Sequence, residues 1–149
     1  MRRGFSLVEL VIVVAVLGIM AAIVVPQFQT NSEQTKAAVA KDSLRILRSA
    51  IELYTAQHGS TPPGYENDDP QVKPTDATFI KQLVASADYL IKMPRNPFNN
   101  LQNIMVIGNS QTLPSNPVDG YGWIYQPATK TIRLSWPGMD SDGIAYYDY

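Results

Sequence analysis

Residues 4–26, GFSLVELVIVVAVLGIMAAIVVP, decide the class of this chain. No residue from 10 to 25 has a charged or strongly polar side chain, and with residues 5–8 the apolar run reaches the ~20 residues that a helix needs to cross a bilayer. Arg2 and Arg3 precede the run, and basic residues beside a membrane helix favour the cytoplasmic side. The segment therefore predicts a transmembrane helix that leaves the rest of the chain outside the cytoplasm.

Two simpler interpretations of this segment are a cleaved signal peptide and a plain single-pass anchor. A signal peptide has an apolar region of roughly 7–15 residues and then a small-residue cleavage site. Here the run is longer and leads into Pro26-Gln27-Phe28, with Ala21-Ala22 only a weak imitation of such a site. A plain anchor does not explain Glu9, because a charge in an apolar span costs about 2.5–3.5 kcal/mol at the helix centre and somewhat less near its end.

Glu9 has two open interpretations of its own. Ser6-Leu7-Val8-Glu9 fits the S-x-x-E capping box, in which the glutamate reaches back to a backbone donor at the helix start. Alternatively, the carboxylate has a partner, since a charge left alone inside an apolar span is costly.

The segment RRGFSLVELVIVVAVLGIMAAIVVP, residues 2–26, resembles the N-terminus of type IV prepilins and in particular of the major pseudopilins of type II secretion systems. It has a basic leader, the junction Gly4-Phe5, and Glu9 four residues past that junction. The resemblance implies that a prepilin peptidase cuts between Gly4 and Phe5 and that the new amino group of Phe5 is N-methylated. It also implies that Glu9 neutralises the Phe5 amine of a neighbouring subunit during assembly.

The resemblance further implies an organisation, a location and a set of partners. It divides the chain into a leader peptide, 1–4, a transmembrane and polymerisation helix, 5–26, and a periplasmic or extracellular head, 27–149. It implies a single-pass protein of the bacterial inner membrane that assembles into a periplasmic or cell-surface filament. The implied partners are copies of itself in a helical homopolymer, the prepilin peptidase, an inner-membrane assembly platform, and minor pilins or pseudopilins.

Two residues interrupt the long N-terminal helix. Gly18 lies inside the apolar run, where with Ala22 it has the small-xxx-small spacing that permits close helix contacts. Pro26 lacks a backbone donor and predicts a kink or a melted turn, which in the family accompanies local unwinding inside the filament. The alternative is that Pro26 simply ends the membrane span.

Beyond Pro26 the pattern becomes that of an amphipathic helix. Apolar residues recur at alternating spacings of four and three, which predicts one buried helix face: Ala40, Leu44, Leu47, Ile51 and Tyr54. His58 and Gly59 predict the helix end, with His58 as an end residue rather than a ligand, and a helix from Phe5 to about Gln57 would span ~80 Å.

The rest of the chain predicts a small head domain. Residues 59–75 are rich in Pro, Gly and acidic residues and predict a loop, after which Thr75 or Asp76 caps a second helix. We expect strands at 103–107, 122–126 and 131–136, with a turn at 127–130. The fold class is α+β, a pilin-like lollipop with a small antiparallel sheet packed on the C-terminal half of the long helix. We expect Trp123 and Trp136 to anchor that core rather than a ligand platform.

One segment offers a candidate metal site. Gly138-Met139-Asp140-Ser141-Asp142-Gly143 places two carboxylates in a turn, and closely spaced oxygens suit Ca²⁺. Major pseudopilins often bind Ca²⁺ in a C-terminal loop, so the resemblance implies Asp140 and Asp142 as ligands. The chain departs from the family by lacking the usual further acidic run, and a solvated Asp-Gly turn is the alternative.

Composition excludes several functional classes. The net charge of −1 leaves no basic surface for nucleic acid, and with no cysteine and a single histidine no nucleophile–base set is visible, so we expect no enzyme. The resemblance implies a structural subunit that polymerises into a type II secretion pseudopilus supporting protein export. The alternative is a type IV pilus subunit for adhesion, motility or DNA uptake, although adhesive pilins usually close a C-terminal loop with a disulfide. A third hypothesis is a monomeric, membrane-tethered binding module.

Overall fold

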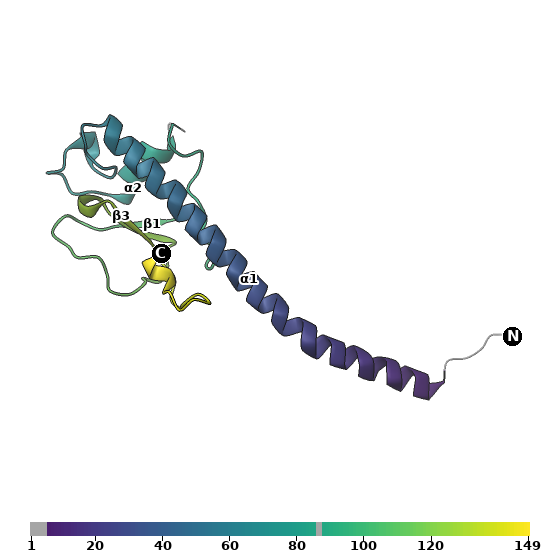
Figure 1. Cartoon of the computed structure of the whole chain (residues 1–149). Helices are drawn as coiled ribbons and strands as arrows, with labels where there is room; N and C mark the ends of the chain where they lie inside the picture. The colour runs from purple at the N-terminus through teal and green to yellow at the C-terminus, as the bar shows by residue number, and fades with distance from the viewer. Residues whose placement is uncertain (1–5, 86–87) are drawn as a thin grey trace. The chain divides into compact units, whose positions relative to one another are not determined.

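The computed structural model describes the backbone of residues 6–85 and 88–149, and the side chains of these residues except 23–31 (Figure 1). The chain divides into two compact units, Met1–Thr35 and Lys36–Tyr149. The predicted cleavage junction, Gly4-Phe5, lies outside the described residues.

Helix α1, Leu7–Gln57, is 51 residues long and confirms the predicted long helix and its end before His58. The helix assignment continues through Gly18 and Pro26. The kink or unwinding at these two residues stays a prediction. At the end of α1, the His58 ring stacks on Tyr54 with ring centroids 3.8 Å apart, and its Nδ1 lies 2.9 Å from the Tyr54 carbonyl oxygen.

The second helix begins where the sequence predicted. Helix α2, Asp76–Ile80, has Thr75 as its N-cap, and the Thr78 amide donates to the Thr75 hydroxyl at 3.1 Å. It continues into a π-helical turn, η2, Lys81–Ala85. Short 3-10 turns also occur at Glu66–Asp68 (η1) and Tyr146–Asp148 (η4).

Three short strands form one sheet in the order β1-β2-β3. They are β1, Ile104–Val106, β2, Trp123–Gln126, and β3, Thr131–Leu134, with the 3-10 turn η3, Pro127–Thr129, between the last two. The pair β2–β3 is antiparallel, as predicted, but β1–β2 is parallel, so the prediction of a wholly antiparallel sheet is wrong. The reason is the connection: residues 107–122 form a crossover of the length that parallel strands need, rather than a tight hairpin.

The sheet packs on the C-terminal half of α1 and forms the core of the second unit (Figure 1). The five apolar residues predicted on one helix face are all buried and belong to one hydrophobic cluster with residues of β2 and β3. Trp123 is fully buried, and its indole N–H donates to the Pro94 carbonyl at 3.0 Å, which confirms a core role. Trp136 is partly buried and stacks on Phe98.

A fully buried amide joins the loop before β1 to the sheet. The Asn96 side chain donates to the carbonyls of Gly122 at 3.1 Å and Ser135 at 3.3 Å, and it accepts from the Phe98 amide at 2.9 Å. Gly122 is required in this packing because a Cβ there would lie 2.5 Å from the Leu101 carbonyl oxygen.

Candidate functional site

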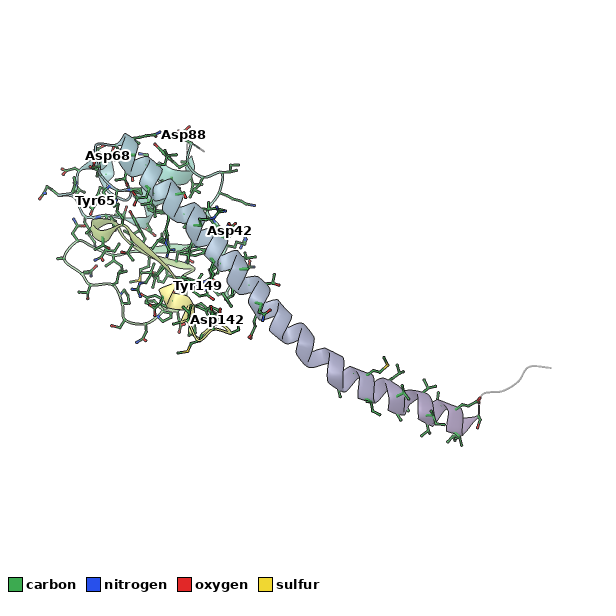
Figure 2. The ribbon with its side chains drawn as sticks, in the orientation of Figure 1. Asp42, Tyr65, Asp68, Asp88, Asp142 and Tyr149 are labelled. Carbon is green, nitrogen blue, oxygen red and sulfur yellow. The ribbon has the colours of Figure 1, made fainter. Side chains whose placement is uncertain are left out.

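The N-terminal part of α1 presents apolar side chains with no cover from the described part of its own chain. Every side chain from 6 to 22 is exposed, and the large apolar ones project on opposite sides of the helix (Figure 2): Leu7, Val8, Leu10, Val11, Ile12, Val13, Val14, Val16, Leu17, Ile19 and Met20. A helix that is apolar all round needs an apolar environment, either lipid or other helices.

Among the described residues, no helix is at once long enough and apolar enough to count as a membrane span. The transmembrane helix at 5–26 stays a prediction.

Glu9 closes a capping box at the start of α1. Its Oε2 accepts the Ser6 amide at 2.9 Å, and the Ser6 hydroxyl oxygen accepts the Val8 amide at 3.3 Å. The local interpretation of Glu9 is thus realised within the single chain. Pairing of Glu9 with the Phe5 amine of a neighbour stays a prediction.

The C-terminal half of α1 carries a second exposed apolar surface, which the sequence interpretation missed. Val39, Ile46 and Leu53 recur every seven residues and are 47%, 43% and 48% exposed. Near its middle the surface is hollowed, and the hollow is lined by Arg45, Ile46, Ser49, Ala50, Leu53 and Tyr89. The seven-residue spacing can be found in the sequence, but it is a weaker signal than the alternating spacing of four and three on the buried face. We call Val39, Ile46 and Leu53 the outer stripe.

At the C-terminal turn, the two candidate metal ligands differ. The Asp140 side chain is 5% exposed and accepts four donors. Its Oδ1 accepts the amides of Asp142 at 3.0 Å and Ile144 at 2.9 Å, and its Oδ2 accepts the Tyr149 hydroxyl at 2.7 Å and the Lys41 ammonium at 3.2 Å. The Tyr149 hydroxyl and then the Ile144 amide are the main causes that lower the pKa of Asp140 to about 2. The Asp142 side chain is exposed, as Figure 2 shows at the edge of this turn.

As they stand, Asp140 and Asp142 do not fit a Ca²⁺ site. Ca²⁺ takes six to eight oxygen ligands, whereas both Asp140 oxygens already accept hydrogen bonds from the protein. In residues 6–85 and 88–149, no group of three or more His, Cys, Asp or Glu side chains could hold a metal ion. Calcium binding stays a prediction that this geometry does not support.

Some known proteins match only a short part of this chain, and others match about two thirds of it. The family of the prokaryotic N-terminal methylation motif matches residues 1–25. Type II secretion system core protein G of Pseudomonas aeruginosa is 32% identical over 99 residues, which cover 66% of this chain and 70% of the relative. Core protein G of Aeromonas hydrophila is 27% identical, with 66% and 69% covered. A fimbrial protein of Pseudomonas aeruginosa is 43% identical over 51 residues, 34% of this chain and 33% of that protein.

No solved structure gives a significant match. The similarity to core protein G nonetheless extends well beyond the shared N-terminal motif, and it accompanies the long helix and small sheet expected of a pilin-like protein. The chain belongs to the family of type II secretion system core protein G, and its residues 1–25 carry the prokaryotic N-terminal methylation motif.

Proposed function

We propose that this protein is a structural, non-catalytic subunit that polymerises into a type II secretion pseudopilus and so supports protein export. One observation carries the proposal: the relatives named type II secretion system core protein G match 66% of the chain, head included, whereas the fimbrial match covers 34%. The shorter match is the reason to keep a type IV pilus subunit as the second candidate.

In the proposed mechanism, the apolar part of α1 first holds the subunit in the inner membrane. A prepilin peptidase removes residues 1–4 on the cytoplasmic face, and Phe5 is methylated. The apolar helix then moves from lipid into a bundle of like helices, a transfer between two apolar surroundings that costs little. The assembly platform and minor pseudopilins would act at this step.

Glu9 selects the register of the incoming subunit in this mechanism. The buried amine of Phe5 and the buried carboxylate of Glu9 on the next subunit are each costly alone, and one alignment removes both penalties. The Ser6 amide donates to the Glu9 carboxylate at 2.9 Å, and this capping bond holds the carboxylate at the start of the helix. Phe5 directly precedes Ser6 in the sequence. A head-to-tail contact of this kind does not close on itself and therefore builds a helical filament.

The outer stripe would extend the subunit contact into the head. Its seven-residue spacing is that of one position of a coiled-coil heptad, which suits packing against another helix. In a filament of identical chains, the helix available to cover it is the exposed α1 of a second copy.

The test separates the charge of Glu9 from its capping bond. Glu9→Val removes both, whereas Glu9→Gln keeps a side-chain oxygen for the Ser6 amide and removes the charge. Each variant is expressed in cells with the assembly machinery, and pseudopili are sheared and measured by immunoblot beside membrane insertion and secreted protein. We expect both variants to insert and neither to form normal filaments. Normal filaments with Glu9→Gln would reject the charge pairing.

Deleting the protein in the same cells distinguishes the two candidate functions. Loss of the protein should abolish export of the secreted proteins while leaving twitching motility and surface pili intact. Loss of surface pili with unchanged secretion would assign the chain to the pilus instead.

A further inference from the structure

The turn 138–143 is closed by its own hydrogen bonds. The Asp140 amide donates to the Ile144 carbonyl at 2.9 Å, the Gly143 amide donates to the Asp140 carbonyl at 3.0 Å, and Met139 and Ala145 form a β-bridge. Gly138 and Gly143 have φ of 95° and 77°, which glycine adopts without strain. With the Asp140 carboxylate capping two further amides, the backbone of the turn is held together by the chain itself.

A cation from the same chain reaches this carboxylate. The Lys41 ammonium, on α1, lies 3.2 Å from Asp140 Oδ2 and 4.2 Å from the centroid of the Tyr149 ring. Tyr149 donates its hydroxyl to the same Oδ2 at 2.7 Å and packs edge-on against Tyr146 with centroids 5.5 Å apart. The ammonium therefore contacts both a nearly buried carboxylate and the face of a fixed aromatic ring, two interactions that favour its positive charge.

We propose that Lys41 supplies, from within the chain, the positive charge that a divalent cation would otherwise provide at Asp140, and that the turn 138–143 stays folded and docked on α1 without a metal. A metal ion binding Asp140 would have to displace the ammonium and the Tyr149 hydroxyl, and the displaced donors would have to find new partners. The turn offers a metal ion only two carboxylates to compensate for these lost interactions, and the second, Asp142, is exposed.

Further contacts hold the C-terminal segment, residues 138–149, which we call the tail, against the rest of the head. Arg133 donates to Asp148 at 2.9 Å, and Arg48 of α1 donates to the main-chain oxygen of Tyr149. Lys41 and Arg48 thus reach the tail from positions two turns apart on α1. Basic side chains of α1 and β3 therefore hold residues 138–149 against the head, and one of them, Lys41, forms an ion pair with the Asp140 carboxylate.

The experiment compares full-length protein in detergent micelles with excess Ca²⁺ and with chelator, so it does not depend on filament assembly. We expect the wild-type Tm to agree within about 1 °C in the two conditions. Lys41→Met, which keeps the length of the side chain and removes the charge, should melt about 2–4 °C lower. The matched control is Arg45→Met, which removes an exposed pair with Asp42 on the same helix and should leave the Tm unchanged.

A wild-type Tm that rises with Ca²⁺, or a Lys41→Met Tm equal to that of Arg45→Met, would overturn the proposal. Tb³⁺ gives a second measurement that holds even if Lys41→Met fails to fold, because tyrosine sensitises the luminescence of bound Tb³⁺ and Tyr149 contacts Asp140. We expect the wild-type protein to give no sensitised luminescence above that of Asp140→Asn. Saturable luminescence that Asp140→Asn abolishes would show a metal site at the turn and reject the inference.

Discussion

At the scale of single residues, the most deeply buried polar side chain among the described residues is that of Asn96. Its side chain is fully buried and makes three hydrogen bonds to main-chain groups: one to Phe98 in the loop before β1, and two to Gly122 and Ser135, which flank β2 and β3. Sequence alone did not single it out, because an Asn beside prolines is typical of a loop. Its burial depends on where residues 122 and 135 come together in the fold.

Asn96→Ala should lower the free energy of unfolding by about 2–3 kcal/mol, because it leaves buried main-chain groups without partners. Chemical denaturation of the full-length protein in detergent, followed by near-ultraviolet circular dichroism, measures the change. Asn116→Ala, at an exposed loop position, is the control and should stay within about 0.5 kcal/mol. Equal stabilities of the two variants would remove Asn96 from this role.

At the scale of elements, the sequence predicted local features well and pairing direction poorly. The buried face of α1, the Thr75 cap and the turn between β2 and β3 follow from spacing and from residue types that act locally. The parallel direction of β1 did not follow, because alternation of side chains reports the two faces of a strand and not the direction of its neighbour.

The outer stripe of α1 gives the prediction that belongs to this scale. Ile46→Glu should leave the isolated subunit as stable as the wild type, because Ile46 is exposed, yet lower the yield of filaments. An apolar contact of about 2 kcal/mol lost from each interface lowers its association constant more than tenfold. Sheared filaments measured by immunoblot, with the Tm of the purified subunit alongside, test this.

Ala38→Glu is the matched control, since Ala38 is exposed on the same helix but turned about 100° from Val39. If Ile46→Glu and Ala38→Glu give equal filament yields, the outer stripe is not a subunit contact.

At the scale of the whole molecule, buried tyrosines make the stability of the head depend on pH in the alkaline range. Burial is the main cause that raises the pKa of five of them: Tyr54, Tyr65, Tyr125, Tyr147 and Tyr149. In the unfolded chain they ionise near their ordinary pKa of about 10. Their contribution to stability is therefore present below pH ~10 and is lost as the pH rises from there through the raised pKa values of the folded state.

We expect the absorbance of tyrosinate and the loss of aromatic circular dichroism to change together above pH ~10, because these phenols ionise when the head unfolds. Tyr125 should contribute most clearly, since its hydroxyl is buried and has no hydrogen-bond partner among the described residues. Ionisation of all the tyrosines near pH 10 with an intact circular dichroism signal would contradict the burial that the structure gives them.

The contact between Lys41 and Asp140 shows where sequence reasoning stops. The two residues are 99 positions apart. The prediction of Ca²⁺ rested on two nearby Asp residues in a Gly-bounded turn and on the resemblance to major pseudopilins. Neither shows that the packing of this turn on α1 brings an ammonium to the carboxylate. By contrast, the N-terminal motif is local, and the match to residues 1–25 agrees with its interpretation from sequence.

The central claim, that this chain is processed and assembled as a pilin-like subunit, is tested most directly at its N-terminus. The measurement is the intact mass and the N-terminal peptide of protein purified from its native membrane. The account predicts loss of residues 1–4 and a methyl group on the amine of Phe5. An unprocessed chain that still begins at Met1 would contradict it, because the Phe5 amine that Glu9 is proposed to neutralise would not exist.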